Sequence, residues 1–220
     1  MQKYSEWRTY YNYLLLIYMN NSALSKLIEI SSPATSDDVP CYSDIESGLI
    51  TLYAKNGYFA FSNALEVFPI GLSKGGYSFW EWNDRNTWIS HYGDLAPDGY
   101  SFAQDLFGVQ FFLSDSIYSF DPETAEINYI ASDVEEWAKK ILIDYKVMTG
   151  QQLADKWQIA RGRLAYRMRL VPIMPFVLGG SYEIDNLVAM DAVEGMRLRA
   201  TLAHQINHLP DGAEISYEVS

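Results

Sequence analysis

The stretch between residues 109 and 131 most constrains the fold, because short apolar segments alternate there with turn sequences. The segments are Val109–Leu113, Ile117–Phe120 and Ile127–Ala131. Ser114-Asp115-Ser116 separates the first two, and Asp121-Pro122-Glu123-Thr124 separates the last two. Asp and Ser favour tight turns through side-chain hydrogen bonds, and Pro favours them through its fixed φ. The pattern therefore predicts three strands that pair as a meander.

Three further β-rich pieces precede the meander, at Leu49–Tyr53, Tyr58–Phe61 and Tyr77–Trp82. Asn56-Gly57 separates the first two, and both residue types tolerate positive φ, so the pair predicts a β-hairpin. Gly75-Gly76 has no glycine fingerprint of the strand-to-helix type around it and predicts an ordinary turn.

Helical signals lie on both sides of these strands. Apolar side chains at three- and four-residue spacings predict a helix over Tyr4–Asn20, and a second helix is expected at Ala23–Glu29 before an exposed connector at 31–43. A short helix is predicted over Asn83–Tyr92 with Trp88 inward, and another runs from a Ser132–Glu135 capping box to Ile143. The helix predicted after the capping box Thr149–Gln152 has Leu153, Trp157 and Ala160 on one face and ends at Gly162. The last predicted elements are a helix over Val188–His208 and a strand over Ala213–Val219.

Charge and cysteine content exclude several classes of protein. A formal net charge of -12 argues against a nucleic-acid binder, which needs Lys and Arg to displace counterions from phosphates. Cys41 is the single cysteine of the 220 residues, so no internal disulfide can form. The apolar run Leu14–Met19 is too short for a transmembrane span and has poor flanks for a signal peptide. We therefore expect a cytoplasmic protein without membrane contact.

The acidic residues are concentrated in one part of the chain. From Glu29 to Glu136 there are 18 acidic and 3 basic residues. Such a region can be a solvated face, or it can steer a basic partner. Seven carboxylates of this region, Asp105 among them, lie in or beside predicted loops, which present recognition groups on a rigid scaffold. The other six form the candidate partner-binding set. The set is Asp94, Asp98, Asp115, Asp121, Glu123 and Glu126.

No residue pattern predicts a catalytic centre, a metal site or a cofactor. His204 and His208 have helical spacing for one metal, but Gln205 stands where a metalloprotease has its general-base Glu. Carboxylates at Glu183, Asp185, Asp191 and Glu194 offer pairs for glycosidase-type chemistry, and pairs of this kind are common in an acidic chain. Trp80 and Trp82 alternate as in a sugar-stacking groove or as in an ordinary strand.

A set of ordered motifs resembles the core of the SUKH superfamily. The motifs of the core are Phe107-Gly108, the 120–124 turn and the stretch 132–137 that ends at Trp137. Downstream motifs resemble the C-terminal extension of bacterial members, and they are Thr149-Gly150, Trp157, Arg169-Leu170, Pro172, Pro175-Phe176, Gly179-Gly180, Tyr182, Asn186-Leu187 and Pro210-Asp211-Gly212. Trp137, Trp157, Pro175, Phe176, Gly179 and Gly180 are the structural-motif residues.

The resemblance implies an α+β domain with a largely antiparallel sheet flanked by helices. It covers roughly residues 48–212, so the expected organisation is an N-terminal helical segment, 1–47, packed on a domain formed by 48–220, in one compact unit. The superfamily includes cell-wall assembly regulators and bacterial immunity proteins that neutralise toxins by binding them. The implied function is an immunity protein for a cognate, basic, nuclease-type toxin. The alternatives are a regulatory scaffold of the same fold and a carbohydrate-active or metal-dependent enzyme.

Overall fold

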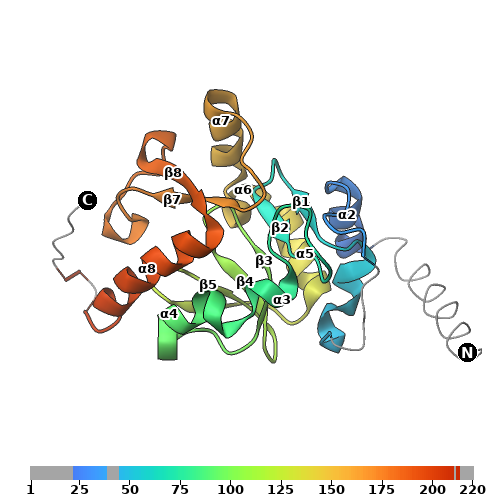
Figure 1. Cartoon of the computed structure of the whole chain (residues 1–220), viewed down its shortest axis with the longest axis horizontal. Coiled ribbons are helices and arrows are strands. Elements are labelled where there is room, and N and C mark those ends of the chain that lie inside the picture. Colours follow the sequence, from blue (N-terminus) through green and yellow to red (C-terminus); the bar gives the residue numbers. More distant parts are fainter. Residues whose placement is uncertain (1–21, 39–44, 211, 214–220) are drawn as a thin grey trace, which may run out of the picture.

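A six-stranded antiparallel sheet forms the centre of the molecule (Figure 1). The computed structural model describes residues 22–38, 45–210 and 212–213. The strands lie side by side in chain order, and a separate antiparallel pair is formed by β7 and β8. The strands are β1 (Tyr58–Ala60), β2 (Leu65–Val67), β3 (Tyr100–Gln104), β4 (Gln110–Leu113), β5 (Ile117–Phe120), β6 (Ile127–Ala131), β7 (Met168–Pro172) and β8 (Leu187–Asp191).

Helices cover both faces of this sheet, which confirms the α+β class expected above. The α-helices are α2 (Ala23–Ile30), α3 (Phe79–Trp82), α4 (Ser90–Tyr92), α5 (Val134–Ile143), α6 (Tyr145–Thr149), α7 (Gln151–Arg161) and α8 (Ala192–Ile206). The other helical elements are the 3-10 helices η2 (Ser47–Ala54), η4 (Gly93–Leu95), η5 (Phe176–Leu178) and η6 (Ile184–Asn186) and the π-helical turn η3 (Arg85–Ile89).

The meander between residues 109 and 131 is confirmed as β4, β5 and β6. Its register pairs Phe111 with Ser119 and Phe120 with Ile127. The turn before β6 is closed by Asp121, whose backbone N–H donates to the carbonyl of Glu126 at 3.0 Å. The turn residues chosen by the sequence pattern therefore set the strand pairing.

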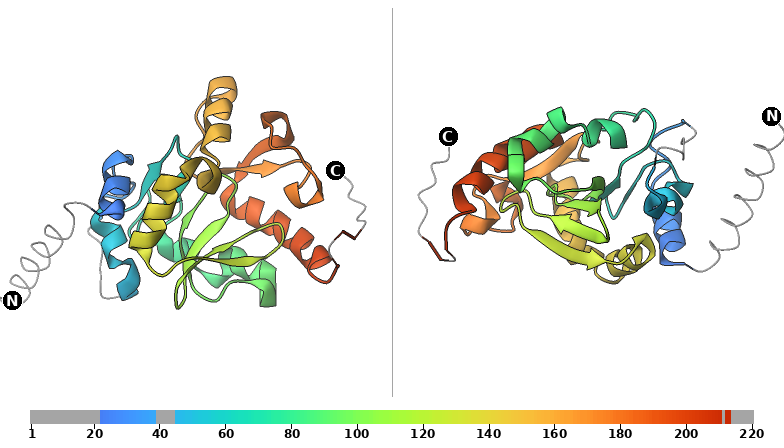
Figure 2. Two further views of the ribbon diagram at one scale, coloured as in Figure 1. Left: turned by 180° about the vertical axis from the view of Figure 1, so that it is seen from behind. Right: turned by 90° about the horizontal axis from the view of Figure 1, so that it is seen from below.

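Different helices cover the two faces of the sheet, as the view from below in Figure 2 shows. On one face the ring of Trp137, from α5, lies 5.1 Å from Phe102 and 5.7 Å from Phe111. On the other face Trp88 and Tyr92 lie 5.8 and 4.9 Å from Phe120. Trp88 is fully buried, as the sequence predicts.

A smaller core lies between α7 and the β7–β8 pair. Trp157 and Leu153 of α7 are buried there with Leu170 of β7. Ala154 is buried in this core, whereas the predicted Ala160 is exposed. The backbone N–H of Leu170 donates to the carbonyl of Leu106 at 3.0 Å and so joins β7 to the end of β3. Gly162 ends α7 as predicted, with φ of 87°.

Several predicted elements have a different form. Leu49–Tyr53 belongs to the 3-10 helix η2, and Tyr77–Trp82 contains the helix α3, which starts from the capping box of Ser78 with Glu81. Consequently Asn56-Gly57 does not join two strands. Helix α5 starts one residue later than predicted, with Asp133 as its N-cap, and Gly150 gives α7 no side-chain cap.

The predicted helix over Val188–His208 is wrong in its first four residues. Residues 187–191 pair with β7 as strand β8, and α8 begins only after Asp191, whose carboxylate accepts from the N–H of Val193 at 3.0 Å. Periodicity alone cannot assign so short an apolar run to a strand or to a helix, so pairing with β7 decides its secondary structure. The predicted helix at Tyr4–Asn20 and strand at Ala213–Val219 lie outside the described residues, apart from Ala213.

The neighbouring glycines of the structural motif have different requirements. A Cβ on Gly180 would lie 1.9 Å from the carbonyl oxygen of Met174, whereas a Cβ on Gly179 would meet no atom within 4 Å. Gly179 instead needs a positive φ, of 88°, at the end of η5, which begins after the buried Pro175.

We expect Gly180→Val to lower the free energy of unfolding by about 2–3 kcal/mol through overpacking. Gly179→Val should cost about 1–2 kcal/mol through backbone strain alone. Urea unfolding of both variants checks this order. Equal losses, or a larger loss at Gly179, would contradict the packing argument.

Candidate functional site

The six predicted partner-binding carboxylates do not form one surface. Tyr100 of β3 is paired with Leu113 of β4, so Asp98 and Asp115, two residues beyond each, lie at the same end of the sheet. Asp121 and Glu126 flank the β5–β6 turn at the opposite end. The four residues of β5 span about 13 Å. This exceeds the Debye length of about 8 Å at physiological salt, so the two groups act on a partner separately.

Glu123 is a correction to the candidate set. Its side chain is 5% exposed, and Oε2 of its carboxylate accepts from the backbone N–H of Val177 at 2.9 Å. Burial raises the pKa of this carboxyl group. Asp121 is only partly exposed, and its Oδ1 accepts from the N–H of Glu123 at 2.7 Å. The Asp121 side chain stabilises the β5–β6 turn, and the Glu123 side chain joins that turn to η5, so both have structural roles.

Asp105 also lies inside the protein, at the β3–β4 turn. Its Oδ1 accepts from the backbone N–H groups of Phe107 and Val109, both at 2.8 Å. Burial raises the pKa of Asp105 to about 7, against the opposing effect of these N–H donors and of the Arg199 guanidinium. Arg199 is 4% exposed and donates from Nε to the carbonyl of Gly195 at 2.9 Å. The contacts of the Asp105 carboxylate therefore stabilise the β3–β4 turn from inside the protein.

The remaining predicted carboxylates are exposed. Asp94 lies in η4, Asp98 lines a small surface cavity of about 300 Å³ with Arg85, and Asp115 accepts from the hydroxyl of Tyr118 at 2.8 Å. Within the described part of the chain, none of these three carboxylates forms an ion pair.

Exposed aromatic side chains accompany Asp98 and Asp115. Trp80 and Tyr100 are each 42% exposed. Their rings contact the same buried ring, Phe79, at centroid distances of 4.9 and 5.9 Å. We call the group Trp80, Asp98, Tyr100 and Asp115 the acidic-aromatic end. Large aromatic side chains beside charged rim residues are typical of protein-binding surfaces.

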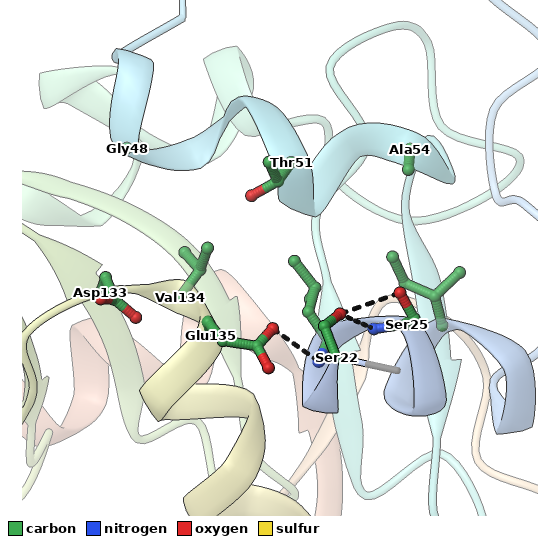
Figure 3. Close-up of a pocket in the computed structure, with 10 residues that line it drawn as sticks. Ser22, Ser25, Gly48, Thr51, Ala54, Asp133, Val134 and Glu135 are labelled. Carbon is green, nitrogen blue, oxygen red and sulfur yellow. Dashed lines mark hydrogen bonds between the residues drawn. The ribbon is translucent and has the colours of Figure 1, made fainter. Parts of the chain in front are cut away.

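A second concave feature is an apolar groove of about 470 Å³ between α2, η2 and the start of α5 (Figure 3). Leu24, Ile28 and Val134 contribute apolar side chains to it, and Thr51 of η2 lies across from α2. Glu135 holds the groove together, because its carboxylate accepts from the backbone N–H groups of Ala23 at 2.5 Å and Leu24 at 3.1 Å. The segment Ala23–Ile30 thus packs on the sheet through α5.

The residues weighed for catalysis or metal binding are dispersed or already paired. Trp82 is fully buried and donates from Nε1 to Gln110 at 2.7 Å, so it cannot share a sugar-binding surface with Trp80. His204 Nε2 lies 3.0 Å from the carbonyl oxygen of His91. The described residues hold no group of three or more metal-ligating side chains. Glu183, Asp185, Asp191 and Glu194 each form an ion pair with a basic side chain.

Comparisons with known proteins bear on the fold. The chain matches no protein-family model and no curated protein sequence. Among solved structures it is similar to Atu4351 from Agrobacterium tumefaciens, with a TM-score of 0.54 and 12% sequence identity over 79% of this chain and 86% of that chain. Within the described residues, no helix combines the length and apolar composition of a bilayer-crossing segment.

Sequence reasoning missed the aromatic part of the acidic-aromatic end. The sequence pattern presents Trp80 with Trp82 as a sugar-stacking pair or as part of an ordinary strand, and it does not single out Tyr100. The capping box Ser78–Glu81 was the available signal, because Ser followed by Glu three residues later marks a helix start. A helix at Phe79 turns Trp82 inward and leaves Trp80 at the surface.

Proposed function

We propose that this chain is a cytoplasmic immunity protein of the SUKH type, which binds a basic toxin and blocks its substrate-binding surface. The acidic-aromatic end is the observation that carries the proposal. It offers a basic surface carboxylates that form no ion pair within the described part of the chain, and it offers aromatic rings to the centre of an interface. The motif order of the sequence and the net charge of -12 support the same function.

Binding would follow from two physical effects. The unpaired carboxylates raise the rate of encounter with a basic toxin domain, which carries positive charge where it holds phosphate. Trp80 and Tyr100 then supply contact area on a rigid support, because both rings rest on the buried Phe79. Occupation of the phosphate-holding surface would exclude nucleic acid from the toxin.

The identity of the partner is tested by affinity capture from the native cells at low and high salt. A basic protein that elutes with salt, that is toxic when expressed alone and that is harmless when co-expressed with this chain supports the proposal. A captured protein that is not toxic would favour the regulatory scaffold, which is the alternative that the same surface supports.

Charge reversal tests the surface itself. Asp98→Lys combined with Asp115→Lys should reduce the association rate with the captured toxin at least tenfold at low ionic strength, with unchanged thermal unfolding. The matched control is Glu126→Lys combined with Glu29→Lys, because both residues are exposed and lie elsewhere. The control should reduce the rate no more than about threefold, through net charge alone. Equal rates for the two variants would place the interface elsewhere.

A further inference from the structure

The six-stranded sheet has one covered edge and one open edge. At the β1 edge, the backbone N–H of Ser32 donates to the carbonyl of Phe59 at 2.7 Å, and the N–H of Phe59 donates to Oγ of Ser32 at 3.0 Å. At the other edge β6 pairs with β5 alone among the described strands, and Figure 2 shows β6 at the border of the sheet. An open strand edge is a template for pairing with a strand of another chain.

The outward backbone groups of β6 belong to Ile127 and Tyr129. In an antiparallel pair, only alternate residues direct their N–H and C=O groups toward the neighbouring strand. The carbonyl of Glu126 accepts from the N–H of Asp121 across the turn, so Asn128 is the next residue of β6 that bonds to β5. Ile127 and Tyr129 therefore direct their backbone groups away from β5, where no described residue bonds to them. Their side chains are 47% and 57% exposed.

We propose that two copies of this chain pair antiparallel through β6, about a twofold axis at Asn128, and so join their sheets into one. In this register Ile127 of each copy lies opposite Tyr129 of the other, and each of these pairs exchanges two backbone hydrogen bonds. A β-branched residue opposite an aromatic residue is a favourable cross-strand pair. The open edge is thus complementary to itself, as a twofold interface requires.

Charge complementarity supports a second copy as the occupant. Ile130 has no register partner on β5, and its carbonyl accepts from Nζ of Lys140 at 2.6 Å. Lys140 also pairs with Glu136 of its own helix at 3.1 Å. The twofold register places Glu126 of one copy opposite Ile130 of the other, so each Glu126 meets Lys140 of the second copy. Glu126 is exposed and forms no ion pair within the described part of the chain.

The interface is small, so the dimer is weak. One pair of five-residue strands buries far less than the roughly 1,600 Å² of a standard interface, so we expect a dissociation constant on the order of 100 µM. The net charge of -12 on each copy opposes association. At physiological salt a Debye length of about 8 Å screens this repulsion, while the direct contacts persist. Dimer formation does not depend on the proposed toxin.

Two charge-reversed variants test the register by sedimentation equilibrium of the full chain at physiological salt. Glu126→Lys alone makes both contacts basic on basic, and Lys140→Glu alone makes both contacts acidic on acidic. Each variant alone should raise the dissociation constant by roughly tenfold or more. An equimolar mixture of the two should dimerise about as well as the wild type, because both contacts then join opposite charges. Tyr129→Lys, at an exposed position, brings two added cations into the interface and should also weaken the dimer by roughly tenfold or more.

Glu29→Lys is the matched control, because Glu29 is exposed on α2, which packs against β1 at the opposite edge of the sheet. This control should dimerise at least as well as the wild type, since it lowers the net negative charge. Thermal unfolding should show that all variants are folded. A wild type that stays monomeric at about ten times the expected dissociation constant would overturn the proposal. Single variants that dimerise like the wild type, or a mixture that stays monomeric, would also overturn it.

Discussion

Glu66→Ala is expected to lower the free energy of unfolding by about 3–5 kcal/mol, because it leaves a buried guanidinium without a counter-charge. Glu66 of β2 is 3% exposed and its carboxylate contacts Arg169 of β7, which is 1% exposed. The same carboxylate accepts from Nε2 of Gln104 at 2.8 Å. Burial lowers the pKa of Arg169 to about 9. The pair connects the main sheet to the β7–β8 pair, and within the described part of the chain it is the only ion pair whose two side chains are both buried.

Urea unfolding of a double-mutant cycle measures this contribution. The single variants of the cycle are Glu66→Leu and Arg169→Met, and each should destabilise the protein, since the first leaves a buried guanidinium and the second a buried carboxylate. Glu66→Leu combined with Arg169→Met should be more stable than either single variant, because apolar groups of similar volume replace the pair without a buried charge. Additive losses in the double variant would show that the two side chains do not interact.

Asp105→Asn is expected to make the protein more stable than the wild type at pH 8, by on the order of 3 kcal/mol. Burial raises the pKa of Asp105 to about 7 in the folded state, against about 3.9 in an unfolded chain. Between these values the folded state retains a proton that the unfolded state has released. The contribution of Asp105 to stability therefore falls as the pH rises from about 4 to 7. The amide oxygen of Asn can still accept from Phe107 and Val109.

The measurement is the free energy of unfolding from pH 5 to pH 8. The stability gain of Asp105→Asn over the wild type should grow with pH throughout this range, because the folded wild type retains the Asp105 proton up to about pH 7. Asp98→Asn, at an exposed site, should give a difference that does not change over this range. A constant difference for Asp105→Asn would mean that the folded protein carries Asp105 ionised at pH 5, stabilised by the nearby Arg199.

Predictions from local patterns succeeded where neighbours in sequence supply the contacts. Strands β4 to β6 and helix α5 follow from turn residues and apolar periodicity within 35 residues of chain. Predictions failed where contacts with a segment distant in sequence determine the secondary structure. Residues 187–191 form β8 only because β7 pairs with them, and β2 and β3 were missed because their apolar residues give no strong alternation.

The candidate site was predictable in part. The concentration of acidic residues and their position in loops were visible in the sequence, and Asp94, Asp98, Asp115 and Glu126 are exposed. Loop position alone does not reveal burial, however. Asp105 and Glu123 lie inside because backbone N–H groups of the neighbouring turns and of η5 donate to their carboxylates.

The sequence by itself determined the antiparallel meander, the acidic character and the turns, since these depend on residue types that interact over a few positions. Only the tertiary structure decided that the acidic residues lie at opposite ends of the sheet, that Trp80 and Tyr100 accompany one group, and that Glu66 meets Arg169. The physical reason is that strand register and burial are set by contacts between segments as far apart as β2 and β7. A one-residue shift in register would turn every side chain of a strand to the opposite face.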